Sequence, residues 1–225
     1  MTPSTADTGT VLVTGAGRGL GRALADLYAA AGFRVIACTR QGTGDAPPLD
    51  VSDAASIAAL GDHLAGVPID IVINNAAIRG DTGGLASLET HGFLEVMRIN
   101  VLAPLLVARA LRPNLLAGRR RVIANIGSRA GSLAEGTIDD EDGDYAYRCS
   151  KAALNMATVK LAQDFRSDGI AVLSLHPGWV KTDMGGTEAA VEVAESALGL
   201  KRLIDDARMA ETGSFRAYDG RTVLW

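Results

Sequence analysis

The stretch TVLVTGAGRGLG, residues 10–21, decides the fold of this chain. It opens with Thr10–Thr14, a run of apolar and β-branched residues that predicts a buried strand. A glycine-rich turn follows, and an Ala- and Leu-rich segment of helical period then continues to Ala31. A buried strand, a tight turn and a helix in this order begin a βαβ unit. The stretch therefore predicts an α/β domain that is built on parallel strands.

Strand and helix patterns alternate along the rest of the chain. Apolar, β-branched runs predict strands at Thr10–Thr14, Arg34–Thr39, Ile69–Asn74, Arg121–Ile126, Ala171–His176 and Ser214–Tyr218. Ala- and Leu-rich segments predict helices at Leu20–Ala31, Asp53–Ala65, Phe93–Leu116, Tyr145–Arg166 and Ala189–Ala207. We therefore predict a Rossmann-type, doubly wound parallel sheet with helices on both faces. A single domain is expected over residues 10–225, after a flexible N-terminal leader over residues 1–9.

Composition and charge exclude several classes of partner. The 225 residues, 48% of them hydrophobic, suffice for one sizeable core and not for two. A net charge of −4 lacks the basic excess that nucleic-acid binding needs. No apolar run approaches the roughly 20 residues of a membrane span. The two cysteines, Cys38 and Cys149, have no metal-ligand spacing, so we expect no metal site and a cytoplasmic location.

The unusual residues gather where the predicted strands end. Glycines follow the first strand, Asn74–Asn75 end the third, Gly127–Ser128 end the fourth and Pro177–Gly178 end the fifth. Ligands of open α/β sheets bind outside the carboxyl ends of the strands. One crevice can therefore collect all four features.

The glycine-rich turn predicts a dinucleotide site. Glycines let the backbone approach a diphosphate closely, and the helix that follows offers unpaired N–H groups and a favourable dipole. The alternative is a tight turn that binds nothing. We expect the turn and its flanks to hold the cofactor, through Thr14, Gly15, Gly17, Arg18, Gly19, Leu20 and Gly21.

The residues after the second strand indicate which dinucleotide binds. NAD sites place an acidic residue about 20 positions past the glycines, on the ribose 2′-hydroxyl. Here the second strand ends at Thr39 and Arg40, and the first carboxylate after it is Asp45. The guanidiniums of Arg18 and Arg40 suit a 2′-phosphate instead. We predict NADPH in preference to NADH, against the alternative of two solvated arginines.

Tyr147 and Lys151 form the candidate catalytic pair. Four helical positions advance about 400°, so both side chains project from nearly the same face, whereas Tyr145 lies about 240° from Lys151. A nearby ammonium favours the phenolate, which moves the phenol toward its working range as a proton donor. Alone, the spacing is more typical of an amphipathic surface pair. Ser128, at a strand end, favours catalysis because its hydroxyl can stabilise a developing oxyanion.

In this order and spacing, these motifs resemble the single-domain short-chain dehydrogenases/reductases over nearly the whole chain. The loop at Thr14–Gly21 is similar to the family's TGxxxGxG, and Asn74–Ala77 resembles NNAG with Ala77 in place of Gly. Segments 178–186 and 218–225 resemble the C-factor and sniffer-type carbonyl reductases.

The resemblance also implies roles for individual residues. Asp50 and Val51 would hold the adenine, Asn100 a water that connects Lys151 to solvent, and Lys151 the nicotinamide ribose. The remaining predicted cofactor contacts are Thr39, Asn75, Ala76, Ala77, Asn100, Tyr147, Pro177, Gly178, Val180 and Thr182.

Together these features predict an NADP(H)-dependent oxidoreductase that transfers a hydride between the nicotinamide and a carbonyl or alcohol. Its substrate would be a small or medium apolar aldehyde, ketone or quinone, and the resemblance implies a homodimer or homotetramer. The alternative is a cofactor-binding signalling or regulatory protein with incidental turnover. Against this alternative, a sensor has no need of Ser128, Tyr147 and Lys151 together.

His176 and the acidic stretch 139–144 lie near the predicted site, but we do not expect them to take part in proton transfer. His176 ends a predicted strand and is interpreted as orienting the backbone rather than acting as a base, since Tyr147 fills that role. The acidic residues 139–144 predict a solvated loop near the mouth of the site. The alternative is that this loop disfavours anionic substrates.

Overall fold

The computed structural model describes residues 9–44, 46–136 and 143–225. Within them, one parallel sheet has the strand order β2-β1-β3-β4-β5-β6. The strands are β1 Thr10–Thr14, β2 Arg34–Cys38, β3 Ile71–Asn74, β4 Val122–Ile126, β5 Ala171–His176 and β6 Phe215–Ala217. The α-helices are α1 Gly19–Ala30, α2 Ala54–His63, α3 Thr90–Met97, α4 Ala103–Ala117, α5 Tyr145–Asp164 and α6 Val193–Asp205. Shorter helical turns are η1 Leu85–Ser87, η2 Arg98–Leu102, η3 Arg129–Gly131 and η4 Met209–Glu211.

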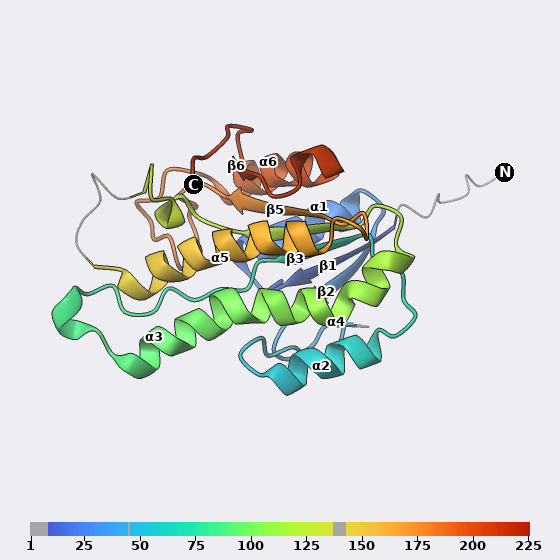
Figure 1. Ribbon diagram of the computed structural model, residues 1–225, viewed down its shortest axis with the longest axis horizontal. Coiled ribbons are helices and arrows are strands. Elements are labelled where there is room, and N and C mark those ends of the chain that lie inside the picture. The colour runs from blue at the N-terminus through green and yellow to red at the C-terminus, as the bar shows by residue number, and fades with distance from the viewer. Residues whose placement is uncertain (1–8, 45, 137–142) are drawn as a thin grey trace.

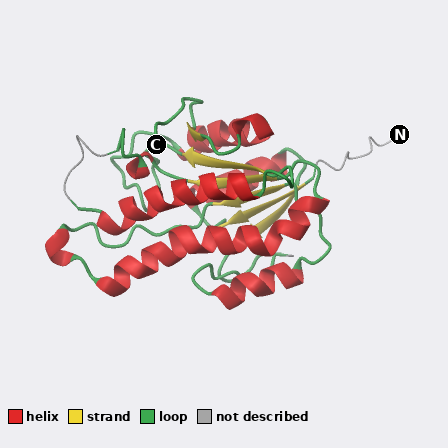
Figure 2. Cartoon of the chain, in the orientation of Figure 1, coloured by secondary structure: helices red, strands yellow, loops and turns green. Residues whose placement is uncertain are grey.

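Helices cover both faces of the sheet (Figures 1 and 2). On β1, Leu12 packs into one buried cluster with α2, α4 and α5. Its neighbours Val11 and Val13 pack into a second cluster with α1 and α6. This alternation follows from the two-residue period of a strand. The predicted Rossmann-type, doubly wound single domain is confirmed.

The strand order places a crevice at one edge of the sheet. From β1 the chain crosses to β2 on one side and later to β3 on the other, so the direction of winding changes between β1 and β3. All carboxyl ends lie at the left of Figure 1, where the predicted site motifs follow their strands. Such a switch point is where ligands bind in open parallel sheets.

Most element boundaries differ from the prediction by one or two residues, and three of the differences have a clear physical reason. The helix predicted at Phe93–Leu116 is α3 and α4 joined by the π-helical turn η2. The helix predicted from Ala189 begins at Val193, because Val191 pairs with Val180 in an isolated β-bridge. The strand predicted from Ile69 begins at Ile71, because the Asp70 carboxylate accepts the N–H of Thr10 at 2.8 Å.

The described residues also limit other sites. No helix among them is long and apolar enough to cross a membrane. They contain no cluster of three or more His, Cys, Asp or Glu side chains that could hold a metal. The predicted leader over residues 1–9, except Gly9, lies outside the described residues, as do Asp45 and residues 137–142.

Candidate active site

The glycine-rich turn between β1 and α1 is held by the loop that follows β3. Asn75 Nδ2 donates to the carbonyls of Thr14 and Gly15, at 3.0 and 3.2 Å. Thr14 Oγ1 accepts the N–H groups of Asn75 and Ala76, at 3.0 and 3.1 Å. A Cβ on Gly21 would lie 2.4 Å from Asn75 Nδ2, so this position requires glycine. The predicted residues Thr14, Gly15, Gly21, Asn75 and Ala76 are therefore in one place.

The first turn of α1 is open to a ligand. Its N-cap residue, Arg18, is extended and makes no side-chain cap hydrogen bond. The backbone N–H groups of Gly19, Leu20 and Gly21 therefore begin a helix whose positive end no side chain neutralises. Gly15 and Gly19 have φ of +66° and +54°, which glycine adopts without strain. This donor set fits a diphosphate.

Ala77 is compatible with the backbone where the family has glycine. Among the described non-glycine residues, positive φ values occur at Arg121 and Asp144. Ala77 therefore has a backbone conformation that accommodates a Cβ, as its presence there predicts.

Thr39 and Arg40 lie beside the glycine-rich turn. Ala16 N donates to Cys38 O at 3.1 Å, and a Cβ on Gly17 would lie 3.5 Å from Thr39 Cγ2. Arg40 is exposed. Arg18 pairs with Asp183 at 2.5 Å, and since both side chains are more than 70% exposed, this ion pair contributes little to stability. The guanidiniums of Arg18 and Arg40 are therefore both accessible to an incoming phosphate.

Asp50 and Val51 lie farther along the same loop. The exposed Asp50 carboxylate accepts Ser52 N at 2.9 Å and Ser52 Oγ at 2.7 Å. These hydrogen bonds, with the charges of Arg40 and Arg98 as smaller causes, lower the pKa of Asp50. Val51 is partly buried against the core. Arg40 therefore acts on the carboxylate of Asp50, the residue predicted to hold the adenine.

Tyr147 and Ser128 meet at the carboxyl end of β4. Tyr147 lies in the first turn of α5, and Ser128 lies two residues past β4. Burial raises the pKa of Tyr147, whereas its hydrogen bond with Ser128 lowers it. Tyr145, in contrast, is 42% exposed. The structure thus brings Tyr147 close to Ser128 and leaves Tyr145 at the surface.

Lys151 is buried beneath Tyr147. Its Nζ lies 5.5 Å from the centroid of the Tyr147 ring and donates to Ile126 O at 2.8 Å. Burial lowers the pKa of Lys151 to about 8. The ammonium therefore faces the site from inside the fold, where little water screens it.

Asn100 joins the loop after β3 to α5. Its Oδ1 accepts Ile78 N at 2.9 Å, and its Nδ2 donates to Ile78 O at 2.8 Å and to Ser150 Oγ at 3.0 Å. Ser150 Oγ in turn donates to Tyr147 O at 2.7 Å. Asn100 lies in the π-helical turn η2, an irregularity that is frequent at functional sites. The Asn100 side chain therefore ties the loop after β3, through Ile78, to the turn of α5 that carries Tyr147.

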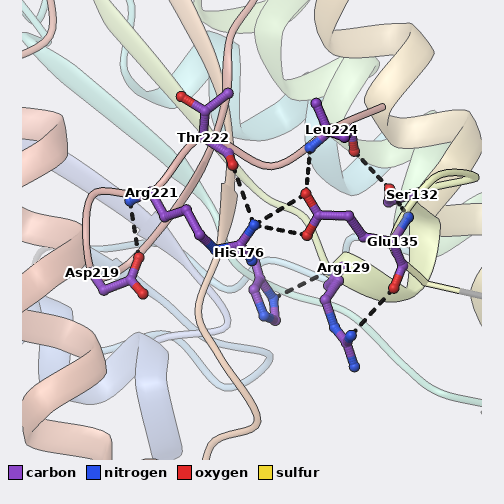
Figure 3. Close-up of polar contacts among 8 residues, drawn as sticks. All are labelled: Arg129, Ser132, Glu135, His176, Asp219, Arg221, Thr222 and Leu224. Atoms are coloured by element: carbon purple, nitrogen blue, oxygen red, sulfur yellow. Dashed lines mark hydrogen bonds and ion pairs between the residues drawn. The ribbon is translucent and has the colours of Figure 1, made fainter. Parts of the chain in front are cut away.

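His176 holds the turn that carries Ser128 (Figure 3). Its Nδ1 accepts the N–H of Arg129 at 3.2 Å. Burial, with the nearby charges of Arg129 and Arg221, lowers the pKa of His176 to about 4. The ring is therefore neutral at physiological pH and free to accept this hydrogen bond. The interpretation of His176 as a backbone-orienting residue is confirmed.

The last residues of the chain brace the same turn from outside. Glu135 accepts hydrogen bonds from Arg221 Nη1 and from the N–H of Leu224, the latter at 2.8 Å (Figure 3). Ser132 Oγ donates to Leu224 O at 2.6 Å. The ring of Trp225 stacks on Phe215 at 5.3 Å. The contacts of Glu135 and Ser132 with Arg221 and Leu224 had no signal in the sequence pattern, because these partners lie more than 80 positions apart.

The segment after β5 approaches the glycine-rich turn. Gly178 has φ of +85°, and Val180 is buried. Thr182 Oγ1 accepts Gly185 N at 3.2 Å, and a Cβ on Gly19 would lie 3.4 Å from Thr182 Cγ2. Thr182 thus lies beside the predicted cofactor turn, and Pro177, Gly178 and Val180 lead to it from the end of β5.

Arg79 and Asp144 are site residues that the sequence did not single out. They form an ion pair, and both charges act on Tyr147. Asp144 was predicted to lie in a solvated acidic loop, but it is buried because it pairs with Arg79. The other acidic residues of that loop lie outside the described residues. The position of Asp144 directly before the helix of Tyr147 was the available signal.

Comparisons with known proteins identify the family of this chain. Residues 9–192 match the short chain dehydrogenase family. The C-signal of Myxococcus xanthus is 42% identical over 158 residues, which are 70% of this chain and 93% of that protein. The NADPH-bound carbonyl reductase from chicken fatty liver has a TM-score of 0.89 at 32% identity, covering 97% of this chain and 95% of that one. The carbonyl reductase Sniffer of D. melanogaster has a TM-score of 0.82 at 26% identity, covering 96% and 99%.

Proposed function

The chain belongs to the short-chain dehydrogenase/reductase family, and we propose that it is an NADPH-dependent carbonyl reductase with Tyr147 as its general acid. The observation that carries this proposal is the convergence of Ser128, Tyr147 and Lys151 at the carboxyl end of β4. Carbonyl reductases among the similar structures, one of them NADPH-bound, support it.

The crevice suits a dinucleotide phosphate. The uncapped first turn of α1 would hold the diphosphate, and Arg40 with Arg18 would hold the 2′-phosphate. Asp50 and Val51 would hold the adenine, Asn75, Ala76 and Ala77 would flank the sugars, and the segment Pro177–Thr182 would contact the nicotinamide. When bound, NADPH supplies the hydride that reaches the carbonyl carbon.

The residues of this chain handle the carbonyl oxygen and its proton. Ser128 Oγ and the Tyr147 hydroxyl both donate hydrogen bonds to that oxygen, which stabilises its developing negative charge. Tyr147 then transfers its proton as the alcohol forms. The ammonium of Lys151, 5.5 Å from the ring, favours the phenolate that remains. The family resemblance assigns Asn100 a water that would connect Lys151 to solvent.

The substrate wall is apolar. Leu133 follows the Ser128 turn and is 78% exposed, and Trp179 follows β5 and is 55% exposed. Large exposed apolar side chains at a site mouth favour ligands with apolar surface. We propose small or medium aldehydes, ketones and quinones as substrates, bound by a cytoplasmic homodimer or homotetramer.

The experiment is a carbonyl panel. The purified protein is given NADPH or NADH with aldehydes, ketones, α-diketones and quinones, and cofactor oxidation and alcohol product are both measured. We expect turnover with at least one class of carbonyl, and higher kcat/KM with NADPH. Binding of NADPH without oxidation by any carbonyl would contradict the proposal.

A second candidate is a cofactor-binding signalling protein. The 42% identity to a protein named C-signal favours it. A signalling role needs the cofactor crevice but not the proton donor with its lysine. The same panel separates the two functions, because the second predicts NADPH binding without turnover.

A further inference from the structure

Arg79 and Asp144 form a two-pronged ion pair at the start of α5. Arg79 Nε lies 3.0 Å from both carboxylate oxygens of Asp144, and Arg79 Nη2 lies 2.5 Å from Oδ2. The Asp144 side chain is 13% exposed and that of Arg79 is 45% exposed. Paired contacts of this kind fix an arginine and a carboxylate in one geometry. The two charges are therefore held at defined positions.

The backbone on both sides of the pair is also fixed. Arg79 directly follows Ile78, whose N–H and C=O are both bonded to Asn100. Asp144 has φ of +56°, and its carbonyl accepts the N–H of Arg148 at 2.9 Å. A Cβ on the neighbouring Gly143 would lie 2.4 Å from Thr82 O, so the two segments pack closely. The pair thus joins the loop after β3 to the first turn of the helix that carries Tyr147.

Asp144 is the N-cap residue of α5, three positions before Tyr147, so the ion pair lies beside the turn that carries the phenol. Burial raises the pKa of Tyr147 and its hydrogen bond with Ser128 lowers it, and beyond these the Asp144 carboxylate raises the pKa and the Arg79 guanidinium lowers it. The coupling is mutual, because Tyr147 adds to the raised pKa of Arg79, after the larger effect of Asp144. Among the described residues, Lys151 faces the ring from α5 and Ser128 faces the hydroxyl from beyond β4.

We propose that the Arg79–Asp144 pair is a tuning element for Tyr147, in which two opposed charges set the pH at which the phenol exchanges its proton. This inference rests on the proposed role of Tyr147 as general acid. Each charge offsets the other, so removing one leaves the other acting alone. Arg79 and Asp144 act through Tyr147 and are positioning residues.

The test titrates Tyr147 without substrate or cofactor. The protein holds four tyrosines, so carbon NMR of protein labelled at tyrosine Cζ gives few signals, and the Tyr147→Phe variant identifies the one from Tyr147. We expect Arg79→Gln to raise the titration midpoint of Tyr147 and Asp144→Asn to lower it, each by about one pH unit. The double variant should return close to the original midpoint, and Arg79→Lys should lie closer to it than Arg79→Gln.

The chain offers a matched control in Arg112 and Asp168. This pair is also two-pronged, at 2.7 and 2.9 Å, and its side chains are 49% and 13% exposed. Asp168→Asn should leave the Tyr147 midpoint unchanged. Midpoints that move in the same direction in both single variants, or that do not move, would overturn the proposal. If Asp144→Asn does not fold, the comparison of Arg79→Gln with Arg79→Lys decides.

The titration separates this proposal from the proposed function. A protein that reduces no carbonyl still gives a Tyr147 midpoint, so an inactive panel and an unmoved midpoint are independent results. Where the panel finds a substrate, the pH profile of kcat should move in the same directions as the midpoints.

Discussion

At the scale of single residues, we propose that Arg40 determines the choice between NADPH and NADH. It stands at the end of β2 beside the glycine-rich turn, and Asp45, the next carboxylate along the chain, lies outside the described residues. We expect Arg40→Ala to lower kcat/KM for NADPH by about tenfold or more and to leave that for NADH nearly unchanged, because one charge-assisted contact with the 2′-phosphate is lost. Equal losses with both cofactors in steady-state assays would count against this assignment.

Some residues of the site follow from sequence and others do not. Tyr147 could be chosen over Tyr145 because helical geometry alone separates their directions. Arg79 and Asp144 could not be paired, because they are 65 residues apart and only the fold brings them together. The Arg18–Asp183 contact was missed for the same reason, because its partners are 165 positions apart.

At the scale of elements, the turn η3 and helix α5 must fit closely for Ser128 to meet Tyr147. A Cβ on Gly131 would lie 2.4 Å from the backbone carbon of Lys151, and Asn155 Nδ2 donates to Gly131 O at 3.2 Å. We expect Gly131→Ala to push the turn away, with a loss of about 1–3 kcal/mol in the free energy of unfolding. It should also lower kcat without a matching change in NADPH affinity.

Gly92 in α3 is the control for this substitution. A Cβ there has no neighbour within 4 Å, so Gly92→Ala should raise the free energy of unfolding by up to about 1 kcal/mol. Urea unfolding of both variants measures the difference. Similar stability in the two alanine variants would show that the close approach of η3 to α5 is unimportant.

Element boundaries were predictable where periodicity alone decides them, as for β1 and β5, which match their predicted limits. They were not predictable where long-range contacts intervene. The π-helical turn that contains Asn100 depends on bonds to Ile78 and Ser150, and the late start of α6 depends on the bridge between Val180 and Val191.

At the scale of the whole molecule, Lys151 links the site to global stability. Its pKa is lowered to about 8 in the folded protein, whereas an unfolded chain holds the proton up to about 10.5. Between these values Lys151 binds more protons in the unfolded state, so the contribution of Lys151 to stability rises with pH. We expect this rise, up to about 3 kcal/mol, to be absent in Lys151→Met.

Unfolding in urea near neutral pH and again at about pH 10 measures the effect. Lys160→Met, which changes an exposed lysine of the same helix, is the control and should keep the rise. A Lys151→Met variant with the same rise as the original protein would show that the lysine is not held in a costly buried state. If the rise is absent in Lys151→Met, burial of the Lys151 ammonium costs the folded protein stability near neutral pH.

The fold as a whole was predictable because the alternation of apolar runs and helical segments specifies a doubly wound sheet. How copies of the chain associate was not predictable in this way, and the homodimer or homotetramer stays a prediction. The exposed apolar side chains Leu94, Leu102 and Met156 on or beside α3, α4 and α5 are where such an interface would lie.

The central claim is that Tyr147 donates the proton in NADPH-dependent carbonyl reduction. The most direct measurement is NADPH oxidation by the best carbonyl of the panel, compared between the original protein and Tyr147→Phe, with NADPH affinity measured on both. We predict that Tyr147→Phe loses turnover by at least about a hundredfold and keeps its NADPH affinity. A Tyr147→Phe variant that binds NADPH and reduces the carbonyl at the original rate would contradict the claim.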